Sequence, residues 1–181
     1  MTSRPLRTSP TMISLVAATA LAAPCGTGNS LVEISPTLAL GVCSDTVVRV
    51  VRTPTASPTA AARMASIASL MVDPSFPSSV PKFTVDNSSA TQTVVTTSTL
   101  KVTVDTSTLE VSYADAATSA ALTGDLGHRF TPATDPASAS ATWSVEQSFS
   151  TTADEQLYGG GEFQNGLVGI KGVPLQLVQF N

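Results

Sequence analysis

The sequence is poor in charge, in aromatic side chains and in the residues that bind metals. Of its 181 residues, 12% are charged and 5% are aromatic, and it has two cysteines and one histidine. With a net charge of −4 and no cluster of Lys and Arg, the chain lacks the basic surface that nucleic acids and anionic membranes bind. A zinc site needs about four ligands, or three and a water. We therefore expect no nucleic-acid partner, no metal and no cofactor.

Long apolar runs are also lacking. The stretch from Met12 to Ala23 is apolar, but it is shorter than the roughly 20 residues that span a bilayer. Arg4 and Arg7 precede it, and Ala20-Leu21-Ala22 fits a small-residue cleavage site. These features predict a signal peptide over residues 1–22, no membrane anchor and a secreted mature chain. Because the stretch is rich in Ser and Thr and has no acidic residue, an organelle transit peptide is the alternative.

The few cysteines suit an oxidising compartment. Cys25 and Cys43 are the two cysteines of the chain, and a disulfide between them would tie the mature amino terminus to the first strands. Asn87-Ser88-Ser89 is an N-glycosylation sequon, which has a meaning only if the chain is secreted. Cys25 and Cys43 are thus our disulfide candidates, and Asn87 is our glycosylation candidate.

What the sequence does contain is a series of short β-branched runs separated by Pro, Ser and Thr. Apolar and polar residues alternate over residues 100–105, and they do so again over residues 109–113 after a short turn. Two such strands make a hairpin with one buried face. Since 42% of the residues are hydrophobic, the chain can build one modest core. We predict a single domain of the all-β class, an antiparallel β-sandwich.

Other stretches complete this pattern. Thr46 to Arg52 is rich in valine, and Trp143 to Phe149 alternates with a period of two, which predicts a strand whose tryptophan packs in the core. Residues 53–63 and 131–142 are rich in Pro, Ala, Ser and Thr and predict long loops. Ala61 to Met71 predicts a short helix.

The last part of the chain carries a recognisable motif. Residues 154–181 resemble the amino-terminal domain of glycoside hydrolase family 31, the α-glucosidase and α-xylosidase family. In that family a Tyr-Gly-x-Gly-(Glu/Gln)-x-x-x-Gly turn leads through a Lys/Arg-Gly pair into a strand that ends Gln-x-Asn. The matching residues are Tyr158, Gly159, Gly161, Glu162, Gly166, Lys171, Gly172, Gln179 and Asn181.

This resemblance implies a fold and a neighbour. In the family the domain is a β-sandwich resembling the galactose-mutarotase fold, and it precedes a (β/α)8 barrel that holds both catalytic carboxylates. The barrel is missing from this chain, and the chain stops inside an apolar strand pattern. We therefore expect residues 23–181 to be a partial β-sandwich, incomplete at its carboxyl terminus.

No catalytic residue is predicted in this chain. Hydrolysis with retention requires two carboxyl groups about 5 to 5.5 Å apart. Glu155 and Glu162 flank a Gly-rich turn, which does not fix such a separation, and the Trp-x-Asp-Met segment of the family barrel is lacking. The single histidine, His128, lies in a Gly/Thr/Pro-rich stretch, and we expect it to be an exposed loop residue rather than part of a triad.

Two amides are the candidates for contact with sugar. Gln164 and Asn165 carry both hydrogen-bond donors and acceptors, which suit sugar hydroxyls. The resemblance implies that a loop of this domain lies beside the pocket of the barrel. The alternative is that both amides satisfy backbone groups of the glycine turn.

The sequence therefore predicts the leading fragment of a secreted family 31 glycoside hydrolase that acts on α-glycosidic bonds. Its partners would be an α-glucoside or α-xyloside and the missing catalytic barrel, and we expect it to be inactive alone. Two alternatives stay open: a stand-alone carbohydrate-binding β-sandwich, and a Ser/Thr-rich extracellular structural protein.

Overall fold

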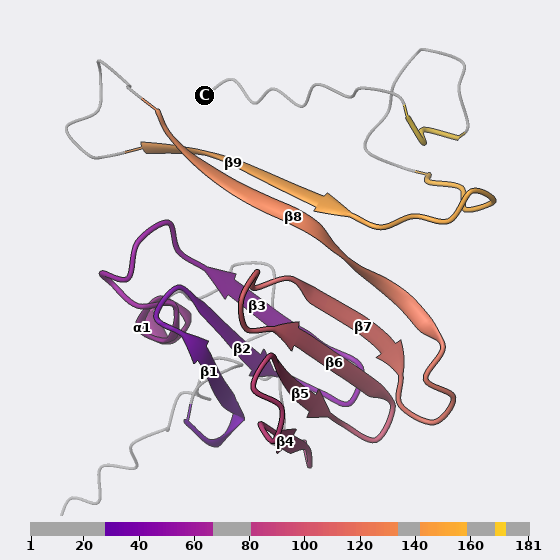
Figure 1. The fold of residues 1–181 in the computed structure, drawn as a ribbon, viewed down its shortest axis with the longest axis horizontal. Coiled ribbons are helices and arrows are strands. Elements are labelled where there is room, and N and C mark those ends of the chain that lie inside the picture. Colours follow the sequence, from indigo (N-terminus) through magenta and orange to yellow (C-terminus); the bar gives the residue numbers. More distant parts are fainter. Residues whose placement is uncertain (1–27, 67–80, 134–141, 159–168, 173–181) are drawn as a thin grey trace, which may run out of the picture.

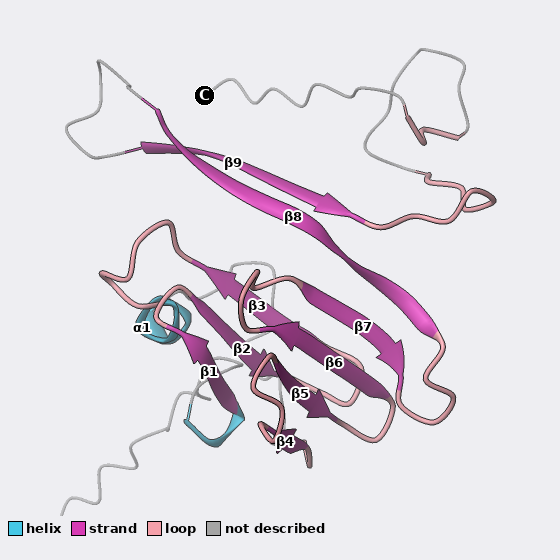
Figure 2. Cartoon of the chain, in the orientation of Figure 1, coloured by secondary structure: helices cyan, strands magenta, loops and turns pink. Residues whose placement is uncertain are grey.

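The computed structural model of the chain describes residues 28–66, 81–133, 142–158 and 169–172. Figure 1 labels its elements, and Figure 2 shows that strands dominate them. The helical elements are a 3-10 turn over Gly28–Ser30 and α1 over Ala60–Ser66. The strands are β1 Leu31–Ser35, β2 Leu38–Val42, β3 Val48–Arg52, β4 Thr84–Asp86, β5 Gln92–Thr96, β6 Leu100–Asp105, β7 Val111–Asp115, β8 Ala121–Ala133 and β9 Thr142–Phe149.

The strands form two antiparallel sheets in simple chain order. One sheet has the order β1-β2-β3, and the other has the order β4-β5-β6-β7-β8-β9. The predicted all-β antiparallel sandwich is confirmed. No helix in the described part of the chain is long and apolar enough to cross a bilayer.

The core lies between the two sheets. Leu38, Leu40 and Val42 of β2 are fully buried, and they face valines of the longer sheet, Val95, Val102, Val104 and Val111. Full burial of one such side chain stabilises the fold by about 1.5 to 3 kcal/mol. The predicted hairpin over residues 100–113 is confirmed as β6 paired with β7, and Val102 lies opposite Tyr113.

β2 is buried on its second face as well. Ala39 packs against Ala60 and Met64 of α1, so that all five residues of β2 are buried. The helix begins after Thr59, whose hydroxyl accepts a hydrogen bond from the Ala62 amide at 3.1 Å, as an N-cap residue does. The predicted helix over Ala61 to Met71 is thus present from residue 60 to residue 66, and residues 67–80 lie outside the described residues.

Two successive hairpins are closed by the same turn. Asp105 Oδ1 accepts hydrogen bonds from the Ser107 and Thr108 amides at 2.8 and 2.9 Å. Ten residues on, Asp115 Oδ1 accepts them from the Ala117 and Thr118 amides at 3.1 and 2.7 Å. The fifth residue of each turn is left-handed, with φ of 61° at Leu109 and 60° at Ser119. These turns set the register of β6, β7 and β8.

β8 is a strand that the sequence analysis does not predict. Its first residues pair with β7 and its last residues pair with β9, up to Ala133 opposite Thr142. The predicted loop over residues 131–142 is therefore wrong at both of its ends. The last three residues of β8 lack the alternation of apolar and polar side chains that predicts a strand. Pairing with β9 favours the extended conformation of Thr131, Pro132 and Ala133. Trp143 lies on β9 as predicted, but it is half-buried and belongs to neither hydrophobic cluster.

Candidate functional site

A pocket of about 410 Å³ opens where the shorter sheet ends. The shorter sheet stops at β3, whereas the longer sheet continues through β8 to β9, and Figure 1 shows the β8–β9 hairpin reaching past β3. We call this cavity the β3–β9 pocket. Its apolar lining is Val50, Tyr113, Phe130, Val145 and Phe149, and its polar lining is Arg52, Asp125, His128 and Gln147.

An ion pair joins the two sheets at the base of the pocket. Arg52, the last residue of β3, donates from Nη2 to Asp125 Oδ2 on β8. The same nitrogen donates to the Leu109 carbonyl at 2.8 Å. The side chains of Arg52 and Asp125 are only 10% and 5% exposed. The attraction between the two charges therefore offsets the hydration that each has lost on burial.

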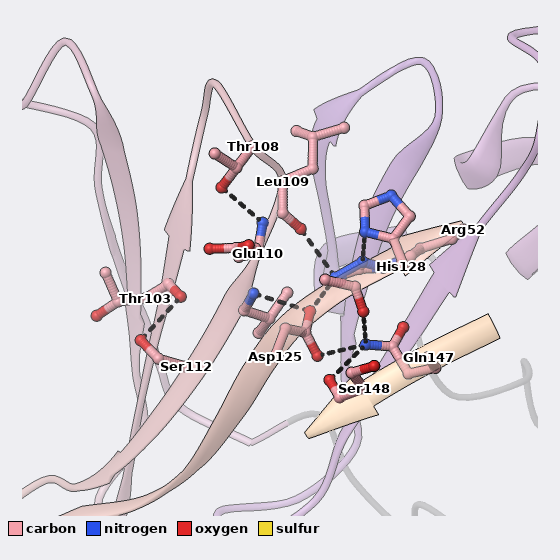
Figure 3. A network of polar contacts seen from close by, with 12 residues as sticks. Arg52, Thr103, Thr108, Leu109, Glu110, Ser112, Asp125, His128, Gln147 and Ser148 are labelled. Atoms are coloured by element: carbon pink, nitrogen blue, oxygen red, sulfur yellow. Dashed lines mark hydrogen bonds and ion pairs between the residues drawn. The ribbon is translucent and has the colours of Figure 1, made fainter. Parts of the chain in front are cut away.

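The carboxylate of Asp125 is fully engaged within the protein. Besides Arg52, it accepts a hydrogen bond from the Val111 amide at 3.0 Å and from Gln147 Nε2 at 2.9 Å. Figure 3 shows these donors converging on it from β3, β7 and β9. Both oxygens are thus occupied, so that this carboxylate is placed to hold the sheets together rather than to attack a sugar.

A β-bulge in β8 brings Asp125 and His128 onto one face. Asp125 lies opposite Phe149 and His128 lies opposite Gln147, so that Leu126 and Gly127 together face Ser148. The extra residue shifts the alternation of side chains by one. Without the bulge, residues 125 and 128 would point to opposite faces. Gly127 has a φ of 138°, a value that residues with a Cβ rarely adopt.

His128 faces the arginine rather than the carboxylate. Its Nδ1 lies 3.3 Å from Arg52 Nη1. A guanidinium group can only donate, so Nδ1 accepts and the neutral ring carries its proton on Nε2. Burial, and after it the charge of Arg52, lowers the pKa of His128, while Asp125 and Glu110 oppose the shift. The expectation of an exposed loop histidine is wrong, because the bulged strand turns this ring toward the pocket.

Tyr113 adds a hydroxyl group to the aromatic lining of the pocket. It is partly buried on β7. Burial and then the negative charge of Asp125 raise the pKa of its phenol, against the opposite effect of Arg52. The phenol therefore stays protonated at neutral pH and can both donate and accept a hydrogen bond. The pocket thus offers the hydrogen-bonding groups of Tyr113, His128 and Gln147 and the Arg52–Asp125 ion pair, beside aromatic and aliphatic walls.

The motif residues that the structure describes lie away from this pocket. Tyr158 is 66% exposed, Gly172 has a φ of 74°, and Lys171 donates to the carbonyls of Thr152 and Ala153. The other predicted site residues lie outside the described residues: Cys25, Gly159, Gly161, Glu162, Gln164, Asn165, Gly166, Gln179 and Asn181.

Three further predictions concern described residues. Glu155 is exposed and accepts a hydrogen bond from the Thr152 amide at 3.2 Å, which is a turn contact. Cys43 is disulfide-bonded, and because Cys25 is not described, the pairing of the two stays a prediction. Asn87 is exposed in the turn between β4 and β5, and its glycosylation also stays a prediction.

Sequence reasoning did not find the residues of the pocket. Arg52 ends a valine-rich strand, and Asp125 stands between Gly124 and Leu126 in a stretch without regular alternation. A charged residue at the end of an otherwise apolar strand is a weak signal by itself. The pairing of Arg52 with Asp125 becomes visible only when the register of β8 is known.

The fold is shared with part of a known enzyme. A crystal structure of a GH31 alpha-xylosidase from Xanthomonas citri matches 81% of this chain with a TM-score of 0.64 and 24% sequence identity. The match covers 16% of the xylosidase chain. This chain has a GH31-like β-sandwich fold. No protein-family model matches the sequence, and no curated protein is similar to it.

Proposed function

We propose that this chain is the noncatalytic amino-terminal β-sandwich of a family 31 α-glycosidase. The observation that carries the proposal is the fold match, which includes most of this chain but only 16% of the xylosidase. The motif over residues 154–181 supports the same family independently. The catalytic carboxylates of such an enzyme would lie in a barrel that follows this domain.

Two described carboxylates, those of Asp125 and Glu155, make structural contacts. Asp125 is buried in an ion pair, and Glu155 is exposed in a turn. In this proposal the sandwich supports the barrel, and Gln164 and Asn165 contact the sugar when the barrel is present.

Secretion is part of the proposal. A signal peptide over residues 1–22 would send the chain to an oxidising compartment, and the disulfide bond of Cys43 supports such a compartment. An α-glucoside or α-xyloside would then be met outside the cell. The organelle alternative predicts the same fold, and the two are separated by where the tagged full chain is found.

The transcript beyond codon 181 and an activity assay test the proposal. We expect an open frame that encodes a (β/α)8 barrel with a Trp-x-Asp-Met segment. We expect the 181-residue chain alone to release no product from p-nitrophenyl α-xyloside or α-glucoside above the buffer blank, and the longer protein to do so. A different domain after residue 181, or hydrolysis by the short chain, contradicts the proposal.

A titration separates the proposal from a stand-alone binding module. The β3–β9 pocket combines aromatic walls with a few polar groups, among them the Arg52–Asp125 ion pair, a composition that ligand pockets share. Isothermal titration of the 181-residue chain with maltose and with isoprimeverose should give no heat above dilution. Heat that Gln147→Ala abolishes would favour the binding module instead.

A further inference from the structure

The charges in the β3–β9 pocket are already balanced. Arg52 and Asp125 pair with each other, and both oxygens of Asp125 accept hydrogen bonds within the protein. The other hydrogen-bonding side chains of the lining are His128, Gln147 and Tyr113, and none of them is charged at neutral pH. A charged ligand would lose hydration here without gaining a free counter-charge. The lining therefore favours a neutral ligand.

Three hydrogen-bonding groups of the lining have no protein partner among the described residues. Nδ1 of His128 faces Arg52, which leaves the Nε2–H donor of the ring free. Gln147 donates from Nε2 to Asp125, which leaves its Oε1 as a free acceptor. The third group is the Tyr113 hydroxyl. No buried side-chain nitrogen or oxygen of the described residues lacks a partner, so these three groups are open to solvent and to a ligand.

Two of these groups lie directly across from each other. His128 on β8 is the register partner of Gln147 on β9. The side chains of opposite residues point to the same face, with Cβ atoms about 4.5 to 5.5 Å apart. One hydroxyl group placed between them can accept a hydrogen bond from His128 Nε2 and donate one to Gln147 Oε1. The two residues together therefore recognise a single group that both donates and accepts.

Aromatic and aliphatic side chains form the walls around this pair. Tyr113, Phe130 and Phe149 come from three successive strands, β7, β8 and β9. Val145 is 63% exposed and Phe149 is 56% exposed, so a ligand that covers them removes apolar surface from water. Aromatic side chains pack well against another flat ring, offset or edge to face. The cavity of about 410 Å³ lies within the range of small-molecule pockets.

A sugar ring matches this lining less well than an aromatic ring does. A pyranose carries hydroxyl groups on most of its carbons, and each hydroxyl that is buried without a partner is unfavourable. The free groups of the lining are few, whereas its apolar side chains are many. A flat ring with one hydroxyl uses both the walls and the pair of His128 and Gln147.

We propose that the β3–β9 pocket is a binding site for a neutral phenolic molecule of one or two fused aromatic rings. The ring lies against Phe130 and Phe149, and the hydroxyl group lies between His128 and Gln147. The contact of Arg52 with Nδ1 keeps the ring proton of His128 on Nε2, from which the ligand accepts its hydrogen bond. This inference does not depend on the proposed function.

Isothermal titration of the 181-residue chain with 2-naphthol tests the proposal. We expect saturable binding of one molecule per chain, and at least about tenfold weaker binding of 2-naphthalenesulfonate, whose charge meets no free counter-charge. Phe149→Ala should weaken the binding of 2-naphthol by about tenfold because it removes one wall, and Gln147→Leu should weaken it because Oε1 is lost. Leu122→Ala is the matched control, since Leu122 is 60% exposed on β8 and does not line the pocket. It should leave the affinity unchanged.

Three results would overturn the proposal. Absence of saturable binding would show that the pocket takes no phenol. Equal affinity for 2-naphthol and 2-naphthalenesulfonate would contradict a site for neutral molecules, and equal effects of Phe149→Ala and Leu122→Ala would place the ligand elsewhere. If Phe149→Ala does not fold, amide chemical shifts of the unmodified chain decide. 2-Naphthol should then move the signals around His128 and Gln147, and movement confined to other strands contradicts the site.

Discussion

Two ion pairs among the described residues have very different surroundings. Arg52 and Asp125 are almost fully buried, whereas Arg129 and Glu146, paired across β8 and β9, are 71% and 60% exposed. A buried charge that loses its partner cannot regain its hydration, but an exposed one can. The two pairs therefore allow a matched comparison within one molecule.

We predict that Asp125→Ala lowers the free energy of unfolding by about 3 to 5 kcal/mol, because it leaves the Arg52 guanidinium buried without a counter-charge. Glu146→Ala, the control, should lower it by less than about 1 kcal/mol. Urea denaturation followed by Trp143 fluorescence measures both. Similar losses in the two variants would mean that the pocket is open enough to hydrate Arg52.

At the scale of elements, the repeated turn offers a second comparison. Leu109 and Ser119 hold the same left-handed position in the β6–β7 and β7–β8 turns. A residue with a Cβ is strained there, and glycine is not. Ser119 is exposed, whereas Leu109 packs against the main core. The same substitution should therefore have opposite effects at the two positions.

We predict that Ser119→Gly raises the free energy of unfolding by about 0.5 to 1 kcal/mol, because it relieves the left-handed strain. Leu109→Gly should lower it, since the lost burial of leucine, up to about 3 kcal/mol, exceeds the relief. Thermal denaturation monitored by circular dichroism distinguishes the two. Loss of stability in Ser119→Gly would show that the hydroxyl has a role in the turn.

The elements that sequence predicted best are those with a regular local pattern. The β6–β7 hairpin and β9 alternate strictly, and the structure has both. β8 is not predicted from the sequence, because residues 121–133 lack a regular alternation and become a strand by pairing with β7 and β9. The pocket was missed for the same kind of reason. Its groups come from β3, β7, β8 and β9, and a single bulged residue, Leu126, decides which of them meet.

At the scale of the whole molecule, stability should depend on pH through His128. Burial and the charge of Arg52 hold the pKa of this ring below its ordinary value of 6.5. The unfolded chain then binds a proton more readily than the folded one, so stability is present above pH 6.5 and is lost as the pH falls through the folded pKa.

We predict that the free energy of unfolding falls as the pH decreases below 6.5, the ordinary pKa of histidine, and that His128→Gln flattens this part of the profile. A separate decrease in the free energy of unfolding should begin below about pH 4, where the carboxylates of Asp105 and Asp115 in the turns become protonated. Hydrogen bonds, chiefly from Ser107, lower the pKa of Asp105 to about 2. Denaturation at several pH values checks both ranges, and an unchanged slope in His128→Gln contradicts the role of the histidine.

The ion pair between Arg52 and Asp125 also bears on the rates of folding and unfolding. Its two residues are 73 positions apart in the chain, whereas β5 to β8 are joined by short turns. Closing a long loop loses more entropy than closing a short one, so we expect the hairpins to form before the β1–β3 sheet docks. Contacts made after the rate-limiting step govern how fast a protein opens rather than how fast it forms. We therefore expect the ion pair to slow unfolding rather than to speed folding.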